Sequence, residues 1–147
     1  FYSPLQTIFW YDKPSFYHGE PEMEWFENLQ TVFDDTKVLN GAPGKNITMA
    51  RRKGQEWFVA AMTNNEGSEE EIPLTFLDKE KNYLACIYTD GGEKIKTSTQ
   101  VKCTYLLVNA SQTMKFQLKP SGGAAIRLVP IDRQEMKKYK KYKGERL

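Results

Sequence analysis

The strongest constraint on the fold of this chain is a series of short apolar segments, each of strand length, that runs from residue 38 to residue 129. Within each segment apolar residues recur at every second position, which is the period of a β-strand with one buried face. Turn residues such as Gly, Pro, Asn and Asp separate the segments. About seven or eight strands at this spacing predict a mainly β fold, an antiparallel β-sandwich.

Two of these segments carry more specific predictions. In residues 56–64, Trp57 and Val59 fall on one face and Phe58 on the other, so we expect a central strand that is covered on both sides. In residues 71–77, Pro73 cannot donate to a strand ladder, which favours an edge strand or a bulge. The other predicted strands lie at residues 46–53, 83–89, 101–107, 114–118 and 124–129.

The chain before residue 35 follows a helical pattern instead. Apolar residues at helical spacing follow Pro4, and a second helix is expected to begin at residues 20–22 and to end near Thr31. The predicted organisation is therefore a helical segment at 1–35, a β-sandwich domain at 36–131 and a Lys-rich tail at 132–147.

The tail concentrates the positive charge of the molecule. It holds seven basic and three acidic residues, a net charge of +4, whereas the whole chain has a net charge of +2 and the remainder therefore −2. A body without a basic surface argues against nucleic acid as a partner. We expect the tail to be solvated and frayed, or to form a charged helix over 132–142.

Targeting segments and disulfides place few constraints on the fold or the function of this chain. No run of about 18 apolar residues predicts a transmembrane helix, and no segment has the pattern of a signal peptide. Phe1 is not a start methionine, so we expect the chain to be part of a longer protein. Cys86 and Cys103 lie on separate predicted strands within apolar alternations; we expect two buried free thiols, the alternative being a disulfide in an oxidising compartment.

No set of residues predicts a catalytic centre or a metal site. His18 is the one histidine, and the sequence has no nucleophile elbow of the form G-x-S-x-G. A triad would need groups such as Ser3, Ser15, Asp12 or Glu20 to meet it. Glycoside hydrolysis needs two paired carboxylates, and three groups of acids are candidates. The first group is expected at a helix start, where acids favour the helix dipole: Glu20, Glu22, Glu24 and Glu27. The second lies in a predicted turn or cap, Asp34 and Asp35, and the third is a solvated acidic cluster, Glu66, Glu69, Glu70 and Glu71.

Other ligand motifs are incomplete. The segment Asp90-Gly91-Gly92-Glu93 has too few oxygen ligands for calcium, and Ser121-Gly122-Gly123 lacks the remainder of a phosphate loop. Asn46 and Asn109 fit the glycosylation pattern, which is frequent by chance. Aromatic rings can cover the apolar face of a sugar. The candidates are Trp10, Tyr11, Trp25, Tyr88 and Tyr105, the alternative being that they belong to the core.

Several segments in a fixed order resemble the C-terminal region of glycoside hydrolase family 97. They are SPLQ at 3–6, PEMEWF at 21–26, DDTKVLNG at 34–41, ARRKG at 50–54 and GGAAIRLVP at 122–130. The resemblance implies that residues 1–35 are the end of a (β/α)8 catalytic barrel and that residues 36–131 are the C-terminal β-sandwich. In that family the catalytic acids and the calcium ligands lie upstream, so no catalytic, metal or cofactor-binding residue is carried over to this chain.

The function that follows is a non-catalytic structural or oligomerisation domain. Its implied partners are the barrel of the parent chain and a second subunit, and its parent is a bacterial α-glucosidase or α-galactosidase that is periplasmic or secreted. The alternative is an autonomous carbohydrate-binding β-sandwich whose sugar-binding residues the sequence does not identify.

Overall fold

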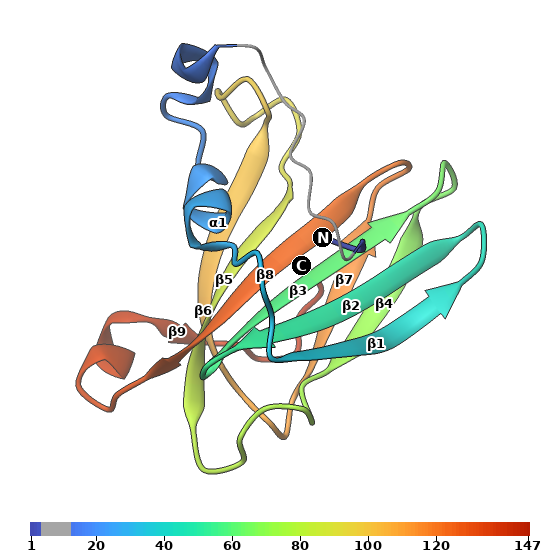
Figure 1. The fold of residues 1–147 in the computed structure, drawn as a ribbon. Coiled ribbons are helices and arrows are strands. Elements are labelled where there is room, and N and C mark those ends of the chain that lie inside the picture. Colours follow the sequence, from blue (N-terminus) through green and yellow to red (C-terminus); the bar gives the residue numbers. More distant parts are fainter. Residues whose placement is uncertain (4–12) are drawn as a thin grey trace.

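The computed structural model describes residues 1–3 and 13–147 and shows a mainly β protein with two facing sheets (Figure 1). The larger sheet has seven strands in the order β1-β2-β3-β8-β5-β6-β9, and the smaller sheet pairs β4 with β7. All pairings are antiparallel except β6 with β9. The strands are β1 (Asp35–Ala42), β2 (Asn46–Lys53), β3 (Glu56–Thr63), β4 (Ser68–Pro73), β5 (Asn82–Asp90), β6 (Val101–Asn109), β7 (Thr113–Leu118), β8 (Gly123–Ile131) and β9 (Lys140–Lys141). The predicted fold class is confirmed.

The centre of the large sheet behaves as the alternation predicts. Strand β3 lies between β2 and β8 and is buried on both faces. Trp57 and Val59 point to the face that packs on the β4–β7 sheet, here called the inner face, whereas Phe58 points to the opposite, outer face. At about 1.5–3 kcal/mol for each large apolar side chain removed from water, such two-sided burial is a main source of stability.

The inner face forms the main core. Residues from β3, β5, β6 and β8 meet residues from both strands of the small sheet. In this core, Ile72 of β4 and Met114 and Phe116 of β7 are buried almost completely. The predicted edge position of Pro73 is confirmed, because it ends β4, which pairs only with β7.

The N-terminal part of the chain covers part of the outer face. Helix α1 (Met23–Asn28) lies over β5, β6 and β8 (Figure 1). Its Trp25 packs against Phe58 and Tyr88, with ring centroids 5.4 Å and 6.4 Å away. Helix α1 is the second of the two expected helices, but it is only six residues long and ends before Thr31. The first expected helix falls within residues 4–12, outside the described part of the chain. After these residues the structure shows a 3-10 helix, Pro14–Tyr17.

The tail differs from both expectations. Residues 132–142 contain a four-residue 3-10 helix, Glu135–Lys138, followed by β9, so the expected charged helix does not form. Nor is the end of the tail frayed: Tyr142 is only 3% exposed and belongs to the main core. None of the described helices is long and apolar enough to cross a membrane.

Candidate interaction surfaces

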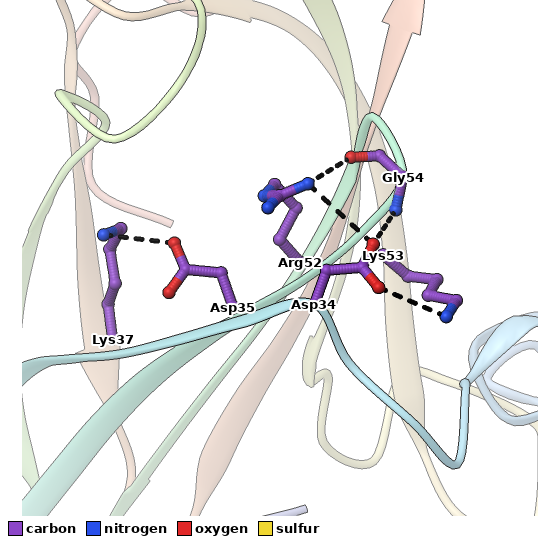
Figure 2. Close-up of polar contacts among 6 residues, drawn as sticks. All are labelled: Asp34, Asp35, Lys37, Arg52, Lys53 and Gly54. Atoms are coloured by element: carbon purple, nitrogen blue, oxygen red, sulfur yellow. Dashed lines mark hydrogen bonds and ion pairs between the residues drawn. The ribbon is translucent and has the colours of Figure 1, made fainter.

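A group of charged side chains ties the start of β1 to the β2–β3 turn (Figure 2). The Asp34 carboxylate accepts a hydrogen bond of 2.7 Å from the Gly54 amide, and Lys53 Nζ lies 3.3 Å from its other oxygen. Arg52 donates to the Gly54 carbonyl at 2.8 Å and also lies 3.9 Å from Asp34. Asp34 thus caps a turn to which it does not belong, so the predicted cap role is confirmed for this residue. For Asp35 the same prediction is wrong, because Asp35 begins strand β1.

The environment of Asp34 stabilises its charged form. The Gly54 amide hydrogen bond, then Lys53 and Arg52, lower the pKa of the Asp34 carboxyl below its usual value. A carboxylate is poorly suited to proton transfer near neutral pH when its pKa is lowered and its oxygens already accept hydrogen bonds from backbone and cationic donors. Its role is to hold the hairpin.

The same end of the sandwich carries cations over an aromatic ring. Lys37 Nζ and Arg52 Cζ lie 6.0 Å and 5.9 Å from the centre of the Trp57 ring, which packs on Phe76 at 4.7 Å. Lys37 also pairs with Asp35 at 3.2 Å (Figure 2). The residues of DDTKVL and ARRKG therefore meet in space, and their contacts serve the packing of this edge.

Arg51 of the ARRKG segment lies on the outer face of the large sheet. Its side chain is buried and its Cζ lies beside the rings of Phe1 and Phe33, at 5.2 Å and 5.3 Å from their centres. It donates to the Ser3 carbonyl at 3.2 Å. The guanidinium thus holds the N-terminal residues against β2 by stacking and by a hydrogen bond.

Two of the helix-start acids, Glu20 and Glu24, bind to the β-sandwich rather than to one another across a cleft. Glu20 accepts backbone hydrogen bonds from Ser98 at 2.9 Å and Thr99 at 3.1 Å, and a further one from the Thr99 hydroxyl, which is the largest cause of its lowered pKa. Tyr105 donates its hydroxyl to Glu24 at 2.8 Å. These contacts dock the segment around α1 on the β5–β6 loop and on β6.

The acidic cluster of residues 66–71 divides between the two faces of β4. Glu69 and Glu71 face solvent and pair with Arg146 and Lys115. Glu70 is only 1% exposed and faces the inner core, so the prediction that it is solvated is wrong. Four neutral side chains donate to its carboxylate: Ser68 at 2.7 Å, Asn46 at 2.5 Å, Asn40 at 2.9 Å and Thr48 at 3.3 Å. This network joins β4 to β1 and β2.

The remaining candidates do not assemble into a reactive site. His18 is exposed at the end of the first 3-10 helix, while Glu20 is directed to Ser98 and Thr99 and Asp12 lies outside the described residues. Within residues 1–3 and 13–147, no group of three His, Cys, Asp or Glu side chains is placed to hold a metal ion. Asp90 accepts from the Gly123 amide at 3.1 Å, which joins the ends of β5 and β8.

The two glycosylation candidates have structural roles. Asn46 accepts from the Ala42 amide at 3.0 Å and donates to Glu70, so its side chain is engaged at the β1–β2 turn. Asn109 accepts from the backbone amide and the hydroxyl of Ser111, which shapes the β6–β7 turn.

Both cysteines are free thiols on the outer face. Cys86 lies opposite Tyr105 and Cys103 lies opposite Tyr88, so the two are offset diagonally on neighbouring strands. Cys86 is buried as predicted, and burial raises its pKa to about 12; Cys103 is half-buried rather than buried. A thiol that stays protonated at neutral pH is not a nucleophile.

The aromatic candidates for sugar binding are mostly core residues. Trp25 and Tyr88 are 5% and 4% exposed, so neither presents a ring face on which a sugar could stack. Tyr105 is 40% exposed, but its hydroxyl is bound to Glu24. Trp10 and Tyr11 lie outside the described residues.

An apolar groove at the other end of the sheet has no counterpart among the sequence predictions. Residues 41–47 and 62–64 line it, and its volume is about 490 Å³. Met62 in its wall is 47% exposed, and Val38, on the same outer face, is 65% exposed. In the sequence, Met62 is the last apolar residue of the strand expected at 56–64, and nothing there distinguishes it from the buried apolar residues before it.

Comparison with known proteins agrees with this arrangement. The family profile described as glycosyl-hydrolase 97 C-terminal, oligomerisation, matches residues 32–129. The chain belongs to this family. Strands β1 to β7 and most of β8 lie within the matched region, whereas β9 and the residues that follow it lie outside.

Relatives of the family 97 domain are much longer than this chain. A retaining α-galactosidase of Bacteroides thetaiotaomicron is 33% identical over 129 residues, which are 87% of this chain but 19% of that protein. A probable retaining α-galactosidase of Streptomyces bingchenggensis is 26% identical over 76% of this chain and 16% of its own length. A family 97 enzyme from Pseudoalteromonas sp. strain K8, solved with acarbose, superposes with a TM-score of 0.71 at 31% identity, over 79% of this chain and 19% of that one.

Proposed function

We propose that this chain is the non-catalytic C-terminal structural or oligomerisation domain of a glycoside hydrolase whose upstream catalytic domain cleaves α-galactosidic or α-glucosidic bonds. The names of the relatives support a glycosidase, and the chain spans about a fifth of the length of the Bacteroides protein. In this proposal residues 1–35 are the end of the catalytic barrel, residues 36–131 the β-sandwich domain and residues 132–147 its tail. Calcium in the barrel and a periplasmic or secreted location of the parent are parts of the same proposal.

The observation that carries this proposal is the use of the carboxylates. Glu20, Glu24, Asp34 and Glu70 each accept hydrogen bonds from the domain itself. Glycoside hydrolysis needs two carboxyl groups that face one another across the scissile bond. Side chains committed to holding α1, a hairpin and the small sheet are not available for that task.

Two measurements test the proposal, one for catalysis and one for sugar binding. Purified chain should not hydrolyse nitrophenyl α-galactoside or nitrophenyl α-glucoside above the buffer rate. Titration with maltooligosaccharides or α-galactosides should give no saturable signal, because Trp25 and Tyr88 are buried and offer no stacking surface. Turnover that saturates with substrate and is lost in Glu22→Gln or Glu24→Gln would contradict the proposal, and saturable sugar binding would favour the carbohydrate-binding alternative.

A further inference from the structure

The groove of residues 41–47 and 62–64, here called the hairpin groove, lies at the end of the outer face that is remote from α1. In Figure 1 α1 covers β5, β6 and β8, whereas the β1–β2 turn lies at the opposite end of the large sheet. Ile47 and Met62, neighbours in the β2–β3 register, form its apolar wall. Exposed apolar groups gathered beside a concave surface are typical of a protein contact.

The rim of the hairpin groove is held rigidly by two adjoining turns. The Asn64 amide donates to the Lys45 carbonyl at 2.7 Å, and the Asn64 side chain donates to the Gly44 carbonyl at 3.1 Å. The β1–β2 turn and the β3–β4 turn are thereby fixed against each other. A contact formed here would need little ordering of the backbone, which reduces the entropy cost of association.

Each of these turns carries one charged side chain of opposite sign. Lys45 is exposed on the first turn and Glu66 is exposed on the second. Neither makes an ion pair with another side chain in residues 1–3 and 13–147. A surface with one cation and one anion side by side is complementary to itself after a two-fold rotation, because the cation of one copy then faces the anion of the other.

We propose that the hairpin groove is the contact between two copies of this chain related by a two-fold axis. Ile47 and Met62 supply the apolar centre, and Lys45 of each copy pairs with Glu66 of its partner at the rim. This inference rests on the proposed function as an oligomerisation domain and names the surface that performs it. An upstream domain seated on the same groove is the competing occupant.

Sedimentation equilibrium of the full chain over a range of concentrations tests the contact. The wild type should show a monomer–dimer equilibrium. Met62→Lys introduces a charge at an exposed site and should weaken the dimer by at least about tenfold, or about 1.4 kcal/mol. The matched control is Val32→Lys, which changes an apolar residue that is 67% exposed in the segment between α1 and β1 and should leave the dimer unchanged.

Charge reversal provides a second test that does not depend on apolar burial. Lys45→Glu and Glu66→Lys should each weaken the dimer, since each places like charges together at two symmetric positions. The double variant should restore most of the affinity, because the pair is reversed but still complementary. Circular dichroism of every variant checks that the fold is retained.

The outcomes separate the surface from the function. A dimer that is insensitive to Met62→Lys and to both charge reversals would show that another surface joins the copies, which overturns this inference and leaves an oligomerisation domain. A chain that stays monomeric at millimolar concentration would overturn the inference together with the oligomerisation role, while the turnover and sugar-binding measurements would still decide the absence of catalysis.

Discussion

At the scale of single residues, Asp34 contributes to stability through its charge. Its folded-state pKa is lowered, so its contribution is fully present above the unfolded pKa of about 3.9 and is lost as the pH falls through the folded-state pKa. Asp34→Ala should therefore make the free energy of unfolding less dependent on pH below about pH 4. Urea unfolding at a series of pH values between neutral and acid measures this dependence.

The control for Asp34 is an acid without these partners. Glu93 is exposed in the loop between β5 and β6, and Glu93→Ala should leave the acid limb of the stability curve as it is in the wild type. Parallel curves for Asp34→Ala and the wild type would contradict the role of Asp34 as a charged cap.

Glu70 is the residue at which the inner core depends on a polar network. Glu70→Gln replaces an oxygen that accepts two donors with an amide nitrogen that cannot accept either. We expect the free energy of unfolding to fall by about 1–3 kcal/mol, the range for buried groups left unpaired. Chemical denaturation compares it with Glu71→Gln, which alters an exposed ion pair of β4 and should change stability by less than about 0.5 kcal/mol. Equal effects of the two variants would refute the network.

The wrong prediction that Glu70 is solvated has an identifiable cause. A run of three glutamates at 69–71 suggests a solvated cluster, but Ser68, Glu70 and Ile72 share one face of β4, and Ile72 is a core residue. Period-two alternation therefore predicts that Glu70 points inward. What it does not predict is the set of neutral donors, because they come from β1 and β2.

At the scale of elements, the C-terminal segment covers one side of the sandwich. Without this segment, β6 and β7 would be exposed edge strands of their sheets on that side. The segment pairs with β6 through β9 and with β7 through residues 146 and 147. The Tyr142 amide donates to the Leu107 carbonyl at 3.0 Å, and the Leu147 amide donates to Lys115 at 2.9 Å. A segment that covers two exposed strand edges protects them from pairing with other chains.

Tyr142 is the residue that anchors this segment. Its hydroxyl donates to the Glu145 carbonyl at 2.8 Å and accepts from the Lys115 amide at 3.0 Å. Tyr142→Phe removes both bonds and should cost about 1–3 kcal/mol, while Tyr142→Ala also leaves a cavity and should cost about 3–5 kcal/mol. Thermal unfolding measures both, and Tyr139→Phe, on the half-buried residue before β9, is the control.

The pH dependence of stability provides a second test of the role of Tyr142. Burial raises its pKa, so its contribution is present below the unfolded pKa of about 10 and is lost as the pH rises further. The difference in stability between the wild type and Tyr142→Phe should shrink at alkaline pH. Growth of that difference above pH 10 would contradict the buried, neutral hydroxyl.

Element boundaries show how local signals compete. The strand expected at 71–77 is β4 at Ser68–Pro73, because the chain leaves the strand after the proline while Leu74 and Leu77 still enter the core. The Leu74 amide then bonds to the Gln112 carbonyl at 2.9 Å, outside both sheets. Apolar periodicity reports burial, and burial continues where the strand does not.

At the scale of the whole molecule, the inner and outer clusters share one sheet. Trp57 belongs to the inner cluster and Trp25 to the outer cluster, and both pack on strands of the large sheet. We therefore expect one cooperative unfolding transition. In a Trp10→Phe background, fluorescence of Trp57 in a Trp25→Phe variant and of Trp25 in a Trp57→Phe variant should each follow the circular dichroism of the same protein. A Trp25 signal that changes well before the circular dichroism would show that the α1 cover detaches independently.

The sequence by itself determined the number and type of most strands, the two-sided burial of β3 and the edge position of Pro73. These features depend on contacts between residues near in sequence and on a period of two, which local chemistry sets. Only the tertiary structure decided the order β3-β8-β5, the inward position of Glu70, the docking of Tyr142 and the exposed groove at Met62. Each of these depends on which distant strand becomes a neighbour, and side-chain periodicity carries no information about that choice.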